Sequence, residues 1–210
     1  MEHAAFAREP KQARSRTSFD RALDAALALL IERRSGTFAL TEVVERSGVS
    51  MGSIYGRVKS KEDLLRSVHA REMGRVEIET LEAFEATAEP TPVDLSAAVD
   101  RAIRSSAQVL RENAEVLRPF MALAAQDPVI GRRGGLGYEH MFGAFRTALL
   151  ERREFIRHPE LERSIRWSFT VSYSVLARWL GLGSEVEAAG EGDWDIMLGD
   201  LTQMVTAYLS

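Results

Sequence analysis

The stretch from Phe38 to Leu65 limits the fold more than any other part of the sequence, because two short helical patterns meet there at a tight turn. Ser47-Gly48-Val49 separates the two patterns. We expect Thr41 to cap the first helix, Gly48 to end it and Ser50 to cap the second. A tight turn containing glycine between two short helices is typical of the helix-turn-helix arrangement.

Longer helical patterns lie on both sides of this turn. Thr17 with Asp20 resembles a capping box, and apolar residues recur at helical spacing from Phe19 onward. Ser60 with Asp63 forms a similar box, which opens a helix running to about residue 84. Residues 1–16 carry basic side chains without apolar periodicity and predict a flexible basic arm. Residues 17–66 then form the helix-turn-helix domain.

The remainder of the chain, residues 67–210, also has helical patterns and no convincing strand alternation. The sequence therefore predicts an all-α protein, with an N-terminal three-helix domain followed by a larger helical domain. A glycine-rich run, Gly131 to Gly137, is expected to break the chain between helices. The expected helices lie near residues 94–112, 114–126, 136–155, 160–181 and 194–209.

Charge and composition narrow the function. The net charge is −4, yet residues 8–71 hold thirteen Lys and Arg against eight Asp and Glu, or +5, which leaves −9 for the rest. A basic N-terminal module suits contact with phosphate, although an uneven scatter of surface charge explains the same counts. The absence of cysteine excludes disulfides, thiolate zinc sites and thiol catalysis. No secretory signal or apolar stretch of about 20 residues is visible, so we expect a cytoplasmic protein without a membrane partner.

Residues 41–65 resemble the DNA-binding signature of the TetR family of transcriptional regulators. The matching positions are Thr41, Gly48-Val49-Ser50, Gly52, Ile54-Tyr55 and Ser60-Lys61-Glu62-Asp63-Leu64-Leu65. This resemblance implies a homodimer that binds double-stranded operator DNA. It also implies a helical domain that dimerises and holds a small-molecule effector.

The second short helix, roughly residues 51–58, is the expected recognition helix. Ile54 and Val58 share one face and can lock it to the domain, so the opposite face is free to enter the major groove. The residues expected to contact DNA are Thr41, Ser50, Met51, Gly52, Ser53, Tyr55, Gly56, Arg57, Lys59 and Lys61.

The sequence departs from the family at three neighbouring positions. The family often has a larger side chain at Gly56, His or Tyr at Arg57 and an aromatic residue at Val58. Direct base contacts would then rest on Ser50, Met51 and Ser53, with part of the specificity coming from DNA shape and the basic arm.

Each expected DNA contact has a structural alternative. Tyr55 could be a half-buried core residue, and Arg57 and Lys61 could be solvated surface charges. Thr41 and Ser50 are expected to be helix caps whether or not they also contact DNA.

The larger domain carries apolar stripes on its last two helices, near 160–181 and 194–209. The resemblance implies that these helices form the homodimer interface, whereas a monomer could bury them in its own core. Aromatic residues and methionines in mid-domain suggest an effector pocket, although for any one of them ordinary core is the simpler interpretation. The candidate ligand-binding residues are Phe120, Met121, Tyr138, His140, Met141, Phe145, Trp167 and Tyr173.

The sequence gives no sign of an enzyme. Its four histidines show neither metal-ligand spacing nor a nearby carboxylate cluster, and no G-x-S-x-G motif is present. The run Gly131 to Gly137 lacks the preceding strand and the Gly-Lys-Ser/Thr ending of a phosphate loop. We therefore expect no catalytic residues, metal or cofactor.

The expected function is a ligand-responsive repressor that binds a palindromic operator and is released by a small apolar or amphipathic molecule. An activator, or a helical structural module without operator binding, is the alternative. Salt-dependent retention on duplex DNA would separate a DNA binder from a structural module.

Overall fold

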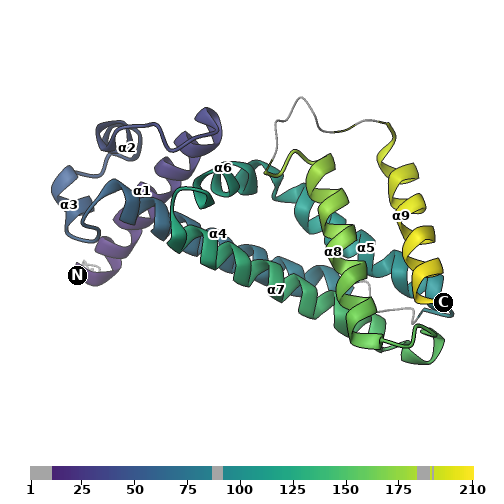
Figure 1. Cartoon of the computed structure of the whole chain (residues 1–210). Coiled ribbons are helices and arrows are strands. Elements are labelled where there is room, and N and C mark those ends of the chain that lie inside the picture. Colours follow the sequence, from purple (N-terminus) through teal and green to yellow (C-terminus); the bar gives the residue numbers. More distant parts are fainter. Residues whose placement is uncertain (1–10, 87–91, 184–189, 191) are drawn as a thin grey trace, which may run out of the picture. The chain divides into compact units, whose positions relative to one another are not determined.

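The computed structural model describes residues 11–86, 92–183, 190 and 192–210 (Figure 1). Over these ranges the regular secondary structure is helical, as predicted, and no strand occurs. The chain divides into two compact units, Met1–Ala70 and Arg71–Ser210. None of the helices in the described ranges is both long enough and apolar enough to cross a membrane.

The first unit is a three-helix domain completed by the first turns of a fourth helix. Apolar residues of all four helices form its core, and Ala26, Leu30, Val43, Ile54 and Leu64 have no exposed surface. The elements are α1 (Lys11–Arg33), α2 (Leu40–Ser47), α3 (Met51–Tyr55) and the start of α4 (Lys61–Ala86).

Helix α1 begins earlier than the capping pattern predicted. It starts at Lys11, so residues 11–16 are helical rather than part of an arm, and Thr17 lies inside the helix instead of capping it. A helix extends beyond its predicted start where the preceding residues have high helix propensity. Lys, Gln, Ala and Arg in this segment are all good helix formers. Residues 1–10 of the predicted arm lie outside the described part of the chain.

The turn between α2 and α3 has the predicted chemistry. Gly48 closes α2 in the left-handed conformation, with φ +66°, and its N–H donates to the Val44 carbonyl at 2.9 Å. Ser50 caps α3, where its Oγ accepts a hydrogen bond from the Ser53 N–H at 3.3 Å. These two residues fix the change of direction between the helices.

The start of α2 differs from the prediction. The helix begins at Leu40, so Thr41 is its second residue and not its cap. The cap position is Ala39, whose N–H donates to the Glu42 carboxylate at 2.7 Å. Glu42 also pairs with Arg33 near the end of α1, and the Ala39 N–H is the main cause that lowers the pKa of Glu42. The carboxylate therefore accepts one of the free N–H groups at this helix start, a position that the sequence assigned to a hydroxyl cap.

The predicted cap of α4 is confirmed. Ser60 Oγ accepts a hydrogen bond from the Asp63 N–H at 3.2 Å, directly before the helix begins at Lys61. From there α4 continues to Ala86, so it starts in the first unit and ends in the second.

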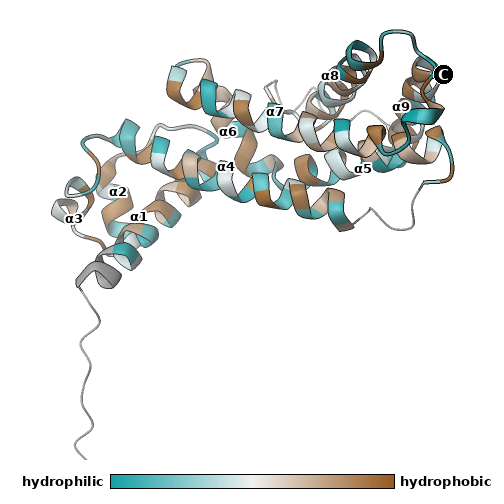
Figure 2. Cartoon of the chain, turned by 90° about the horizontal axis from the view of Figure 1, so that it is seen from below, coloured by the Kyte–Doolittle hydropathy of each residue, from teal (hydrophilic) through white to brown (hydrophobic). Residues whose placement is uncertain are grey.

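The second unit is a helical bundle built around α5. Residues Ala98, Val99, Ala102 and Ile103 of α5 are fully buried, and α5 contacts α7, α8 and α9. Each helix carries polar residues beside apolar ones, which matches burial on one side only (Figure 2). The elements are the later turns of α4, α5 (Leu95–Glu112), α6 (Ala114–Ala124), α7 (Pro128–Leu150), the 3-10 turn η1 (Arg153–Phe155), α8 (Leu161–Trp179) and α9 (Trp194–Leu209).

The glycine-rich run is helical, contrary to the predicted break. Asp127 caps α7 by accepting a hydrogen bond from the Val129 N–H at 2.8 Å, and Pro128 occupies the first turn, where proline is tolerated. A Cβ at Gly131 would lie 3.2 Å from the Ala124 carbonyl oxygen of α6. Glycine therefore permits the close approach of two helices at this position, and the cap compensates for its low helix propensity.

The left-handed turn at Gly48 yields a prediction on stability. We expect Gly48→Ala to lower the free energy of unfolding by about 1 kcal/mol, because a Cβ is strained at positive φ although no atom lies within 4 Å of it. Chemical denaturation monitored by circular dichroism measures this loss.

Gly52→Ala is the matched control, since that Cβ also meets no atom within 4 Å but its backbone is helical. Equal stability of the two variants would contradict the prediction, because it would show that an alanine at position 48 causes no backbone strain.

Candidate functional site

The two faces of α3 and the turn after it differ as the sequence predicted. Ile54 has no exposed surface and Val58 is 6% exposed, so both lie in the core of the first unit. Helix α3 contacts both α1 and α2. Its opposite face therefore stands clear of the domain core, as a recognition helix requires.

Tyr55 is a surface residue. Its side chain is 52% exposed, which removes the alternative that it is a half-buried core tyrosine. A ring with a phenolic hydroxyl can pack on a sugar and donate to a phosphate, so its position suits a contact at the edge of a groove.

The exposed face of α3 is otherwise lined by small groups. Gly52, Ser53 and Gly56 are exposed, and a Cβ at Gly52 would meet no atom within 4 Å. Ser53 Oγ lies 2.9 Å from Ser50 Oγ, so the two hydroxyls are already hydrogen bonded to each other. The small side chains let the helix backbone approach a ligand closely.

The remaining expected contacts lie on α2, on α3 and in the segment after α3. Arg57 and Lys59 are exposed, as is Thr41 at the start of α2. The Arg57 guanidinium carbon lies 5.7 Å from the centre of the Phe19 ring, which holds this side chain against α1. Met51 is half-buried. The structure thus brings the predicted residues of the α2–α3 segment together on the first unit.

Lys61 has an intramolecular role that the sequence did not reveal. Its ammonium donates to the Gly36 carbonyl at 2.7 Å and to the Phe38 carbonyl at 3.0 Å, and it lies 5.4 Å from the centre of the Phe38 ring. These contacts tie the start of α4 to the loop between α1 and α2. The ammonium is therefore a structural clamp, which leaves the backbone at this position for any contact with phosphate.

The clamp leads to a second prediction. We expect Lys61→Met to reduce the free energy of unfolding of the first unit by about 2 kcal/mol, because two carbonyls lose a charged donor. Thermal and urea denaturation measure the change.

Lys59→Met is the control, because Lys59 is exposed and should leave stability unaltered. A Lys61 variant as stable as the wild type would show that the clamp contributes nothing.

The candidate ligand-binding residues of the second unit lie mostly in its packed interior. Phe120, Met141 and Phe145 are buried, whereas Trp167 is exposed and Met121 is half-buried. The rings of Tyr138, Phe169 and Tyr173 pack against one another in tilted and edge-to-face arrangements, with ring centres 4.9 to 5.8 Å apart. Burial raises the pKa of Tyr173 to about 12, so it remains a neutral phenol at ordinary pH.

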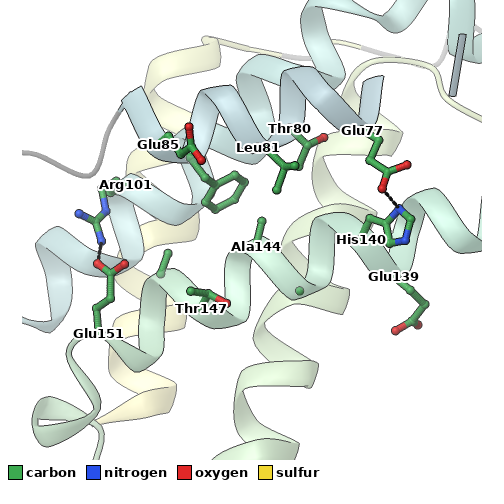
Figure 3. Close-up of a pocket in the computed structure, with 13 residues that line it drawn as sticks. Glu77, Thr80, Leu81, Glu85, Arg101, Glu139, His140, Ala144, Thr147 and Glu151 are labelled. Atoms are coloured by element: carbon green, nitrogen blue, oxygen red, sulfur yellow. Dashed lines mark hydrogen bonds and ion pairs between the residues drawn. The ribbon is translucent and has the colours of Figure 1, made fainter. Parts of the chain in front are cut away.

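A cavity of about 480 Å³ opens between α4, α5 and α7 (Figure 3). His140 is the candidate ligand residue that lines it, and its Nδ1 lies 3.0 Å from a Glu77 carboxylate oxygen. The other lining residues are mixed apolar and charged side chains, so no cluster of aromatic residues in the sequence indicated them. Helix α4 contributes Glu77, Thr80, Leu81, Phe84 and Glu85, and α5 contributes Arg101. The rest of the lining comes from α7, from Glu139 to Ala148, and from Glu151 directly after that helix.

The last two helices divide their apolar residues between the core and the surface. Leu198, Leu201 and Val205 of α9 are buried within the protomer. Ile196 and Met204 are 66% and 64% exposed on the other side of the helix. The predicted stripe therefore serves the protomer's own core and also leaves an apolar outer face.

No group of three or more His, Asp or Glu side chains in the described ranges is arranged to hold a metal ion.

Comparison with known proteins connects this geometry to a family. Residues 22–68 match the model of the bacterial regulatory proteins of the tetR family. The match runs from the middle of α1 to the start of α4 and includes the turn at Gly48. It agrees with the prediction of a DNA-binding regulator rather than an enzyme. A search of curated proteins finds no match.

Solved structures share the fold over most of the chain. A Mesorhizobium loti protein classed as a TetR-family transcriptional regulator has a TM-score of 0.69 at 19% identity, and the similarity covers 93% of this chain and 96% of that one. GusR of Salmonella enterica has a TM-score of 0.61 at 21% identity, covering 92% and 95%. The fatty acid degradation regulator FadR of Bacillus halodurans has a TM-score of 0.57 at 19% identity, covering 90% and 94%.

Proposed function

We propose that this chain, whose residues 22–68 match the model of the bacterial regulatory proteins of the tetR family, is a dimeric, ligand-controlled transcriptional repressor. The observation that carries the proposal is the exposed face of α3, where Tyr55 projects beside a backbone that only small side chains cover. A short, rigidly packed helix of this kind fits the major groove, with base contacts from Ser50, Met51 and Ser53.

The operator is expected to be a palindrome. Two copies of the first unit, related by a two-fold axis, present two recognition helices to half-sites about 34–36 Å apart. The partner in this arrangement is a second copy of the chain, joined through α8 and α9.

The surface of α8 and α9 supports that assignment. The two helices contact each other, and a depression between them is lined by Val175, Trp179, Ile196 and Met204. Gly199 and Ala207 are exposed small residues on the same helix as the last two, so a partner helix can approach closely. An apolar face rimmed by polar residues is typical of an interface.

The ligand is proposed to control DNA binding by shifting an equilibrium between two spacings of the recognition helices. The effector is proposed to bind the second unit, and α4 is the connecting element because its residues belong to both units. The effector must bind the spacing that does not fit DNA more tightly than the spacing that does, because equal affinity shifts no equilibrium. A small apolar or amphipathic molecule would then release the operator.

Selection of random duplexes by the purified protein, followed by sequencing, tests operator binding. We expect enrichment of one palindromic motif and a loss of that enrichment in Tyr55→Ala, because the substitution removes a DNA contact without touching the core. Arg133→Ala, which removes an exposed cation from α7, is the control and should enrich the same motif. Absence of any enriched motif at low salt would contradict the proposal.

Analytical ultracentrifugation tests the dimer. We expect Ile196→Glu to convert a dimer into a monomer, because it places a charge in an apolar interface that must then desolvate it. Leu136→Glu adds the same charge at another exposed apolar side chain, on α7, and should leave the dimer intact. An Ile196→Glu variant that remains dimeric would place the interface elsewhere.

A further inference from the structure

The cavity between α4, α5 and α7 has the lining of a site for one chemical class of ligand. It lies wholly within the second unit, and its volume of about 480 Å³ is within the range of small-molecule sites. The later turns of α4 form one wall and α7 the other (Figure 3).

The centre of the cavity is apolar. Leu81 projects from α4 and is 55% exposed, although it is a large apolar residue. Phe84 packs beside it against the core of the second unit, and Ala144 and Ala148 face them from α7. A Cβ at Gly143 would meet no atom within 4 Å, so this part of the wall leaves room for a ligand. The uncovered Leu81 is therefore a surface that an apolar ligand body could cover.

Carboxylates flank this apolar centre. Glu77 and Glu85 lie one helical turn before and after Leu81 on α4, roughly 6 Å away in each direction along the helix axis. Both residues line the cavity. An apolar surface with a carboxylate on either side fits a molecule that joins an apolar body to a positive charge.

The other charged groups of the lining are already engaged. The Arg101 side chain is 10% exposed and donates to Glu151 at 2.8 Å. Glu139 receives a hydrogen bond from Arg166 at 2.8 Å and turns away from the cavity in Figure 3. An anionic ligand would therefore meet the Glu77 and Glu85 carboxylates while the one arginine of the lining is committed to Glu151.

The contact between His140 and Glu77 indicates how this carboxylate would bind a cation. The His140 Nδ1 lies 3.0 Å from the Glu77 carboxylate, so this acid already interacts with a nitrogen donor at the cavity wall. A ligand ammonium can share the same carboxylate or replace the imidazole as its partner.

We propose that this cavity binds an amphipathic organic cation, in which an amine or a quaternary ammonium is attached to an apolar body of moderate size. The apolar body covers Leu81 and Phe84, and the cation is held by Glu77 or Glu85. The assignment of this molecule as the effector rests on the function proposed above, whereas its binding to the cavity does not.

Isothermal titration calorimetry of the full chain with three matched probes tests the proposal. The probes are 4-phenylbutylamine, 4-phenylbutanol and 4-phenylbutyrate, which share one apolar body and differ in charge. We expect the amine to bind at least tenfold more tightly than the carboxylate. The ratio of the two affinities should decrease as the salt concentration increases, because salt screens the charges. Equal or tighter binding of the carboxylate or the alcohol, or no binding of the amine, would overturn the proposal.

Two variants locate the site. Glu77→Gln/Glu85→Gln keeps the shape of both side chains and should abolish the preference for the amine. Glu82→Gln removes an exposed carboxylate from α4 that does not line the cavity, and it should leave the preference intact. Unchanged amine binding in the double variant would refute the assignment of these carboxylates. Circular dichroism confirms that each variant is folded.

Operator binding, measured separately without any probe, distinguishes this inference from the proposed function. Amine binding that leaves the protein on its operator would sustain the cavity assignment and refute ligand-controlled release. Operator binding by a protein that prefers the carboxylate would sustain the DNA-binding proposal and refute the cavity assignment.

Discussion

The burial of Ile54 and Val58 in the first unit is the interaction on which the proposed DNA contacts depend. Helix α3 has five residues, and a helix of that length is unstable in water by itself. Packing of these two side chains beneath it, with Ser50 at one end and the left-handed Gly48 just before it, fixes its position. Because this packing holds the α3 backbone in place, the helix needs no large side chains on its exposed face to fit a groove. That face carries Tyr55 and otherwise mainly small residues.

Much of this domain could be predicted from the sequence, because its determinants are local. Gly48, Ser50 and Ser60 act within three or four residues of their own positions, and the two-faced pattern of α3 follows from helical periodicity. The predicted start of α2 was wrong because the helix begins at Leu40. The carboxylate of Glu42, and not the hydroxyl of Thr41, accepts the N–H of the cap residue Ala39. A hydroxyl near a helix start is common, and the sequence does not show which oxygen reaches the free N–H groups.

The features that could not be predicted involve residues distant in sequence. Lys61 contacts carbonyls more than twenty residues earlier, so its clamp is invisible until the loop between α1 and α2 is placed. The glycine run of α7 is helical behind the Asp127 cap, and at Gly131 the absence of a side chain lets α6 approach closely. The ligand-binding residues were predicted from a cluster of aromatic side chains, most of which pack in the interior of the second unit. The cavity instead lies between α4 and α7, where its lining mixes apolar and charged side chains.

Amide NMR of the isotopically labelled protein, titrated with its selected duplex, tests whether α3 contacts the DNA. We expect the largest chemical-shift changes at residues 50–57, while the amides of the α5 segment Ala98 to Ile103 change little. Shift changes that spare residues 50–57 in a protein that still binds the duplex would contradict the claim that α3 reads the DNA.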